Sequence, residues 1–137
     1  MTLLELLNAT DRFANGAGVR LTEVGEGFAR AEMTVEERHI NGGGVCQGGA
    51  IYTLVDLAFA AVANSRGTLS LGTNYNITFL HSAMLGDKLT AECTEVCDHH
   101  KLPYFEVKVK NHNGCLIAAM TAQGYRTKRD MPFDALM

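Results

Sequence analysis

One carboxylate lies in a stretch of the chain that is otherwise apolar. Residues 48–65 read GGAIYTLVDLAFAAVANS, and Asp56 is the single charged residue among them. Burying an unpaired carboxylate is costly unless the group is hydrogen-bonded or protonated. Asp56 is therefore either a structural carboxylate held by Thr53, Asn64 or a strand amide, or a catalytic base or nucleophile.

Two glycines at the start of the same stretch offer a second chemical group. Gly48 and Gly49 stand where a helix would begin, and the first amides of a helix have no intrahelical partner. Without side chains these amides are approachable, and amides aligned with a helix dipole stabilise an oxyanion. The pair could therefore polarise a carbonyl group for attack.

The distance between these two groups argues against a site within one chain. At the helical rise of about 1.5 Å per residue, Asp56 lies roughly 12 Å along the axis from Gly48. A two-fold axis would place the carboxylate of one subunit opposite the helix start of another, and the reverse. The sequence thus predicts a site shared between subunits, with a homodimer as the minimum assembly.

The elements that position these groups can be read from the sequence pattern. Residues 48–65 are apolar on every face and rich in alanine, which favours a helix of about 27 Å enclosed by the rest of the fold. Before it, NGGGVCQGG predicts a loop shaped by glycine, and such loops often carry function. Alternating apolar residues predict four strands, which no helical pattern interrupts: 69–80, 88–96, 104–110 and 115–126. Their pairing should be mostly antiparallel.

The two ends of the chain carry weaker patterns. Residues 2–14 predict a short amphipathic helix with Thr2 as N-cap and Glu5 three positions on. Alternation from Val19 to Val35, broken by Gly-Glu-Gly at 25–27, predicts two strands joined by a hairpin turn. Residues 127–137 read as a flexible tail.

Composition favours one small domain and excludes several functions. The chain has 137 residues, 47% of them hydrophobic and 20% charged, enough for a single core over 1–137. The net charge is -3 with interspersed signs, so we expect no nucleic-acid partner. The first residues lack a basic segment and a long apolar run, which predicts a cytoplasmic protein that neither enters nor crosses a membrane.

Neither the cysteines nor the histidines form a metal-binding pattern. The chain has four cysteines and five histidines, but no Cys-x-x-Cys pair and no ligand spacing of the kind zinc requires. We expect reduced cysteines, mostly in the core, and no metal ion or cofactor.

The segment from Asn41 to Ser65 resembles the signature of the PaaI-type hotdog thioesterases. That signature has an Asn, a glycine-containing loop, His-Gly-Gly and a helical Asp, and here the segment reads N-GGGVC-Q-GG-AIYTLV-D-LAFAAVANS. The resemblance continues through NYNITFL at 74–80 and GDKLTAE at 86–92, and then to Arg126. It implies an α+β hotdog fold, in which an antiparallel sheet wraps a long central helix.

The resemblance also implies an activity and roles for site residues. The activity is hydrolysis of an aryl- or medium-chain acyl-CoA to the free acid and CoA. The Gly48 amide would polarise the thioester carbonyl with Asn41 beside it, and Asp56 of the facing subunit would activate water or attack directly. Gly49 would contact substrate, and the subunits would form a homotetramer from dimers.

Three positions depart from the family pattern. The histidine before the glycine pair is Gln47, which can donate a hydrogen bond but cannot titrate near neutrality. The position at which the family often has a Ser or Thr that helps to hold water is occupied by Gly72 in this chain, with Thr73 next to it. A basic residue and proline near the CoA phosphates are replaced by His81 and Ser82.

Several further residues are candidates for substrate contacts. Lys101 stands where the family commonly has a Gly-Lys or Gly-Arg pair, and with Arg126 and Lys128 it could bind CoA phosphates, the alternative being solvated charges. The acyl group could lie against four residues whose alternative role is ordinary core packing: Tyr52, Leu57, Phe59 and Tyr75.

Two other functions remain open on the sequence. A non-catalytic module that binds acyl-CoA would keep the fold, with Gln47 and Gly72 as traces of lost chemistry. A dehydratase-type hotdog protein would require a histidine paired with the helical acid, and the motif contains none.

Overall fold

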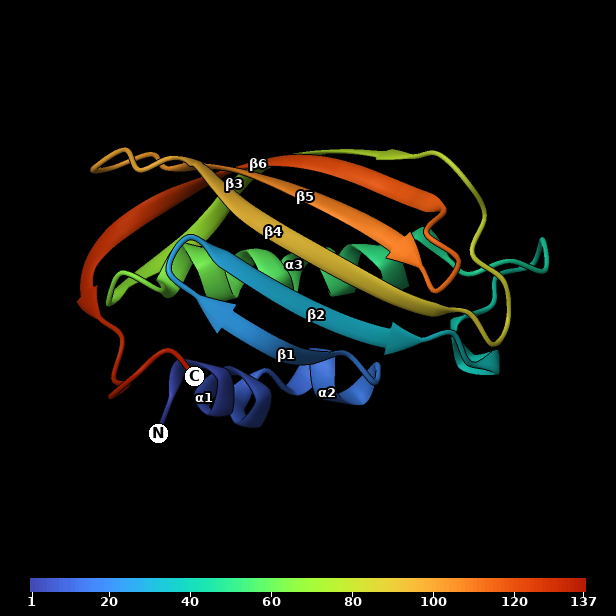
Figure 1. Ribbon diagram of the computed structural model, residues 1–137, viewed down its shortest axis with the longest axis horizontal. Helices are drawn as coiled ribbons and strands as arrows, with labels where there is room; N and C mark the ends of the chain where they lie inside the picture. The colour runs from blue at the N-terminus through green and yellow to red at the C-terminus, as the bar shows by residue number, and fades with distance from the viewer.

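A curved six-stranded sheet wraps around one long helix in the computed structural model, which describes all 137 residues (Figure 1). The strands lie in the order β1-β2-β4-β5-β6-β3, and every neighbouring pair is antiparallel. Their bounds are β1 Arg20–Gly25, β2 Phe28–Thr34, β3 Thr68–Phe79, β4 Lys88–Cys97, β5 Tyr104–Asn111 and β6 Leu116–Asp130. The predicted architecture and pairing are confirmed.

The central helix α3, Gly48–Asn64, forms the middle of the core. Ten of its 17 residues are buried, and they pack against the concave face of the sheet. The prediction that the helix is enclosed on every face is wrong for the single chain. A stripe at helical spacing stays partly or fully exposed because the sheet ends at β3; it consists of Gly49, Tyr52, Thr53, Asp56 and Ala60.

The amino-terminal segment forms two short helices where one was predicted over 2–14. Helix α1, Leu3–Thr10, begins with the expected capping box between Thr2 and Glu5. Helix α2, Arg12–Gly16, begins separately because the Asp11 side chain accepts a hydrogen bond from the Ala14 amide at 3.0 Å. An aspartate that caps a new helix ends the previous one.

The carboxyl-terminal segment is docked, in contrast to the predicted flexible tail. Residues 127–130 belong to β6, whose Asp130 pairs with Thr68. Beyond the strand, the Leu3 amide donates to the Ala135 carbonyl at 2.8 Å, and the amino terminus pairs with Asp134 at 2.8 Å. The two ends of the chain therefore lie together (Figure 1).

Other features of the fold bear on the remaining expectations. None of the helices combines the length and the apolar character needed to cross a bilayer. The four cysteines are unpaired, and of these Cys46 and Cys93 are buried whereas Cys97 is exposed. No group of three potential metal ligands comes together.

Candidate active site

The loop before α3 is held in place by its own hydrogen bonds. The Asn41 side-chain oxygen accepts from the amides of Gly43 at 2.9 Å and Val45 at 3.2 Å, and Gly44 has the positive φ of 84° that glycine permits. The Gln47 amide donates to His39, the last residue of the 3-10 helix η1, Glu37–His39, at 2.7 Å. The loop therefore presents the start of α3 in a fixed position.

The first amides of α3 are free. No hydrogen bond uses the amides of Gly48 and Gly49, and Gln47, at the N-cap, gives them no side-chain cap. A side chain at Gly48 would lie 3.1 Å from the Phe79 ring, and one at Gly49 would lie 3.0 Å from the Gln47 side-chain oxygen. Two unpartnered donors at a helix start can stabilise negative charge on a bound oxygen.

A cavity of about 290 Å³ opens beside this helix start. Its walls include Gly48, Phe79 and His81, so the structure brings two of the predicted site residues together. The His81 ring is oriented by a 2.8 Å hydrogen bond between its Nδ1 and the Leu116 carbonyl oxygen. The cavity is mainly apolar, with these polar groups at its edge.

Asp56 lies in a separate cavity of about 470 Å³ farther along the helix. The walls are formed by two α3 residues, Tyr52 and Asp56, and by β3 residues 71–75, which include the predicted Gly72 and Thr73. The Asp56 carboxylate accepts a hydrogen bond from the Tyr75 hydroxyl. The structure thus places Asp56 on the exposed stripe of α3, against the edge strand.

The partners that the sequence suggested for Asp56 are occupied elsewhere. The Thr53 hydroxyl donates to the Gly49 carbonyl at 2.9 Å, and the Asn64 amide donates to the Ala60 carbonyl at 2.8 Å. Tyr75 was predicted only as a pocket-lining residue, so its bond to Asp56 was missed. Only the packing of α3 against β3 brings these two residues together.

The surroundings of Asp56 make its charge costly. Burial raises the pKa of Asp56, the hydrogen bond from Tyr75 lowers that pKa in part, and the charge of Asp11 raises it further. No ion pair involves Asp56. Burial and the neighbouring carboxylate also raise the pKa of Tyr75, so its hydroxyl remains a donor. A carboxylate of this kind is suited to accept a proton.

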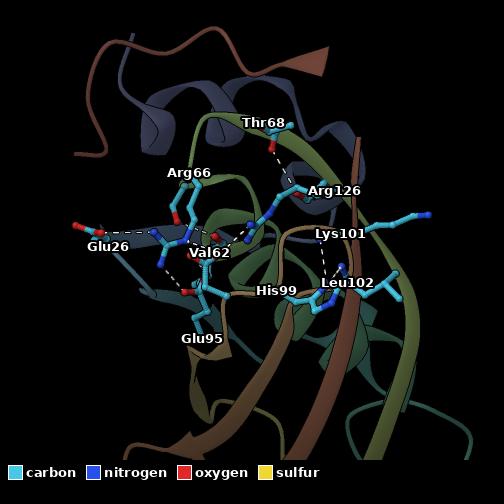
Figure 2. A network of polar contacts seen from close by, with 12 residues as sticks. Glu26, Val62, Arg66, Thr68, Glu95, His99, Lys101, Leu102 and Arg126 are labelled. Atoms are coloured by element: carbon cyan, nitrogen blue, oxygen red, sulfur yellow. Dashed lines mark hydrogen bonds and ion pairs between the residues drawn. The ribbon is translucent and has the colours of Figure 1, made fainter. Parts of the chain in front are cut away.

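Two of the predicted CoA contacts belong to a different region of the molecule. Figure 2 shows a polar network beyond the end of α3 that includes Arg126. The Arg126 side chain bonds Asp98 at 2.7 Å and is only 14% exposed. The network therefore occupies Arg126. The Lys101 side chain points away from the network, and Lys101 lines neither cavity described above. Lys101 and Lys128 are exposed, and their contacts with CoA stay predictions.

The four residues considered for an acyl pocket separate into two pairs. Leu57 and Phe59 are 1% and 2% exposed and belong to the core. Tyr52 and Tyr75 line the Asp56 cavity, with ring centroids 5.4 Å apart. Only the two tyrosines are therefore placed to meet a ligand.

Comparison with known proteins gives consistent similarities. A family model described as the thioesterase superfamily matches residues 43–120. A putative esterase from Archaeoglobus fulgidus is 40% identical over 95% of this chain and 78% of its own length. The acyl-coenzyme A thioesterase PaaI of Escherichia coli is 29% identical over 85% of this chain and 83% of its own length.

Solved structures share the fold over nearly the whole chain. The E. coli PaaI protein from the phenylacetic acid degradation operon superposes with a TM-score of 0.90 and 26% identity, covering 93% of each chain. A Streptococcus mutans protein solved with bound acetyl-CoA has a TM-score of 0.79 and 25% identity, covering 82% of this chain and 91% of that one.

Proposed function

Because the chain belongs to the thioesterase superfamily, as a thioester hydrolase of the PaaI type with the hotdog fold, we propose that it hydrolyses an aryl- or medium-chain acyl-CoA to the free acid and CoA. One observation carries the proposal. One helix carries both a carboxylate without a cationic partner, on its exposed stripe, and two unpartnered amides, at its first two residues.

The proposed reaction assigns one task to each group. Asp56 removes a proton from water, and the hydroxide adds to the thioester carbonyl carbon. On the alternative route Asp56 adds directly to that carbon, and the acyl–Asp56 anhydride that remains after the thiolate leaves is hydrolysed by water to the free acid and the Asp56 carboxylate. The Gly48 amide and the side-chain NH₂ of Asn41 donate to the oxyanion, with Gln47 beside them. The intermediate then expels the CoA thiolate, which takes up a proton. A thiolate leaves readily, so a base and oxyanion donors suffice.

Substrate contacts follow from the two cavities. Gly49 and His81 would meet the substrate beside the helix start, whereas Gly72 and Thr73 would meet it beside Asp56. Lys101 would contact a CoA phosphate from the β4–β5 connection. Acetyl-CoA bound in the S. mutans relative supports an acyl-CoA as the ligand class.

We propose that each active site is shared by two subunits. The two cavities are separate, and roughly 12 Å of helix divides Gly48 from Asp56. Strand β3 beside Asp56 is a sheet edge with exposed apolar side chains, Leu71 at 54% and Phe79 at 48%. A long, uncovered edge strand that also exposes apolar side chains is a surface for pairing with another chain. Pairing there would bring a second α3 close to Asp56, and stacked dimers would give the homotetramer.

The proposal is tested by thiol release from benzoyl-, phenylacetyl- and medium-chain acyl-CoAs. We expect turnover by the wild type and a loss of at least about 100-fold in kcat for Asp56→Asn, the size expected when a general base is removed. Circular dichroism must show that the variant is folded. Asp130→Asn, an exposed change at the end of β6, is the matched control.

Two other results would contradict parts of the proposed function. Turnover retained by folded Asp56→Asn would exclude Asp56 as base or nucleophile. Saturable CoA-ester binding without thiol release by the wild type would favour the binding module.

The shared site is tested separately by subunit mixing. Chains carrying Asp56→Ala are mixed with chains carrying Asn41→Ala, and mixed dimers are isolated by two affinity tags. A shared site predicts partial recovery of turnover, because one of the two sites in such a dimer would combine intact groups. Verified mixed dimers with no more activity than either parent would contradict it.

A further inference from the structure

Tyr75 and Gly72 fit together on β3 in a way that depends on the glycine. A Cβ atom at Gly72 would lie 2.4 Å from the Tyr75 hydroxyl oxygen, 2.6 Å from Cε1 and 2.7 Å from Cζ. These separations are shorter than any normal van der Waals contact, so every other residue at position 72 would displace the ring. The Tyr75 hydroxyl occupies the space that a side chain at 72 would fill.

An irregularity in β3 makes this contact possible. Residues 72 and 75 would face opposite sides of a regular strand, because side chains alternate. The register shifts between Gly72 and Asn74, which pair with Gly124 and Gln123 on β6, so Thr73 is an extra residue. The Thr73 hydroxyl donates to the Gln123 carbonyl at 3.1 Å. Bulges of this kind often reorient a side chain next to an active site.

Aromatic packing fixes the direction of the tyrosine. The Phe59 ring meets the Tyr75 ring edge-on with centroids 5.2 Å apart, and the Tyr52 ring lies on another side at 5.4 Å. The ring is half-buried, and its hydroxyl donates to the Asp56 carboxylate. Little freedom is left for the hydroxyl to turn elsewhere.

Resting on the proposed hydrolysis, we infer that Tyr75 is a positioning residue: its hydroxyl, seated in the space left by Gly72, orients the Asp56 carboxylate toward the substrate and favours its charged form. One carboxylate oxygen accepts the hydroxyl, and the other remains available for water or the carbonyl carbon. Tyr75 takes no part in proton transfer, because its own proton stays bound.

Among the titratable groups around Asp56, only Tyr75 favours the charged form of the carboxylate. Tyr52 faces it from α3 and Asp11 from the junction of α1 and α2, and Cys93 on β4 lies behind Tyr75. None of these groups is a cation. The Tyr75 hydrogen bond is therefore the contact that opposes the cost of burying the charge.

The role is tested by the pH profile of kcat/KM in Tyr75→Phe. We expect kcat/KM at the low-pH end to fall by roughly tenfold, the loss typical of one hydrogen bond to a charged group, and the loss to shrink as the pH rises. The loss is larger at low pH because a carboxylate without its hydrogen-bond donor keeps its proton up to a higher pH. An equal loss at every pH, or none, would overturn the inference.

Tyr52→Phe is the matched control. It removes a hydroxyl from the wall of the same cavity, but this hydroxyl makes no hydrogen bond with Asp56. We expect the midpoint of the low-pH limb of its kcat/KM profile to be unchanged, even if KM itself changes. A shift equal to that of Tyr75→Phe would show that the effect is not specific to the Asp56 contact.

A second variant covers the case in which Tyr75→Phe does not fold. Gly72→Ala leaves the tyrosine chemically intact but displaces its hydroxyl, so it should reproduce the pH-dependent loss. Gly16→Ala is its control, because a methyl group there meets nothing within 4 Å. An unchanged profile in Gly72→Ala would overturn the inference.

A measurement independent of turnover separates this inference from the proposed function. The ¹³C signal of the Asp56 carboxyl group is titrated in the wild type and in Tyr75→Phe. A higher midpoint in the variant supports the contact, and equal midpoints overturn it, even if no acyl-CoA is hydrolysed. Wild-type inactivity would instead remove the proposed function.

Discussion

Two regions of the molecule hold carboxylates, one on α3 and one beyond its end, and their surroundings differ. In the first region, Asp56 has one tyrosine hydroxyl and no cation. In the second, beyond the end of the helix, the Arg66 guanidinium bonds both oxygens of Glu95 at 2.5 and 3.1 Å and lies 3.2 Å from Asp98, which also pairs with Arg126 (Figure 2).

The difference supports the proposal that the first region performs the chemistry. The acids of the Arg66 network are each paired with at least one arginine, as in a structural ion-pair cluster. Asp56 is kept at an energetic cost and next to a cavity, which is the arrangement expected of a reactive carboxylate. Both regions contain carboxylates that are partly shielded from solvent. Their partners differ, because the acids of the second region pair with arginines and Asp56 has only a tyrosine hydroxyl.

The largest expected effect is on the stability provided by the Arg66 network. Glu95→Gln removes the acid whose side chain is 8% exposed and which binds Arg66 through two oxygens. We expect unfolding in urea to show a loss of about 2 kcal/mol, with kcat changed by less than about twofold. Glu106→Gln, which breaks an exposed pair with Lys108, is the control and should cost less than about 0.5 kcal/mol. A folded Glu95→Gln enzyme without turnover would contradict the assignment of a purely structural role to the Arg66 network.

An opposite effect on stability is expected in the first region. Because burial raises the pKa of Asp56, the folded state prefers the protonated acid, so this group favours folding at low pH. That contribution is lost as the pH rises from about 4 through the folded pKa. Asp56→Asn cannot ionise and should melt at a higher temperature than the wild type near neutral pH. Each gain of about 1 kcal/mol would appear as roughly 4 °C.

The pH dependence supplies the check on that sign. The advantage of Asp56→Asn should disappear near pH 3, where both proteins are uncharged at this position. Asp134→Asn is a control of opposite sign, because pairing with the amino terminus lowers the pKa of Asp134 and favours folding above about pH 4. A less stable Asp56→Asn at neutral pH would mean that the carboxylate stabilises the fold.

The smallest expected effect concerns Arg126. Its Nε and Nη2 atoms are buried without a hydrogen-bond partner, so the pair with Asp98 is offset by unsatisfied donors. Replacement by methionine should change the free energy of unfolding by less than about 1 kcal/mol, measured by urea titration. A loss above about 2 kcal/mol would show that Arg126 holds the network together.

Local patterns were enough to predict most elements of this fold. Alternation located every strand to within a few residues, and the apolar run fixed α3 because both signals depend only on neighbouring residues. The errors arose at a local helix cap and at a tertiary contact, neither of which periodicity records. Asp11 starts a second helix, and the last residues dock against α1, although a polar, short segment gives no periodic signal of either.

The candidate site was predictable in part for the same reason. The lone charge at Asp56 and the glycines at 48 and 49 stand out in the sequence because composition and spacing are local. The close fit between Gly72 and Tyr75 does not stand out. Strict alternation would place the two residues on opposite faces of β3, whereas the bulge at Thr73 places them on the same face. No sequence pattern reveals a bulge that depends on pairing with β6.

The sequence by itself determined the helix, the strands, the glycine loop and an isolated acid that requires compensation. The tertiary structure decided which side chain compensates that acid, which face of α3 stays uncovered, and that Gly48 and Asp56 open into different cavities. The physical reason is that periodicity records whether a residue faces inward. Strand order and register decide which residues meet there, and these arise from contacts far apart in the chain.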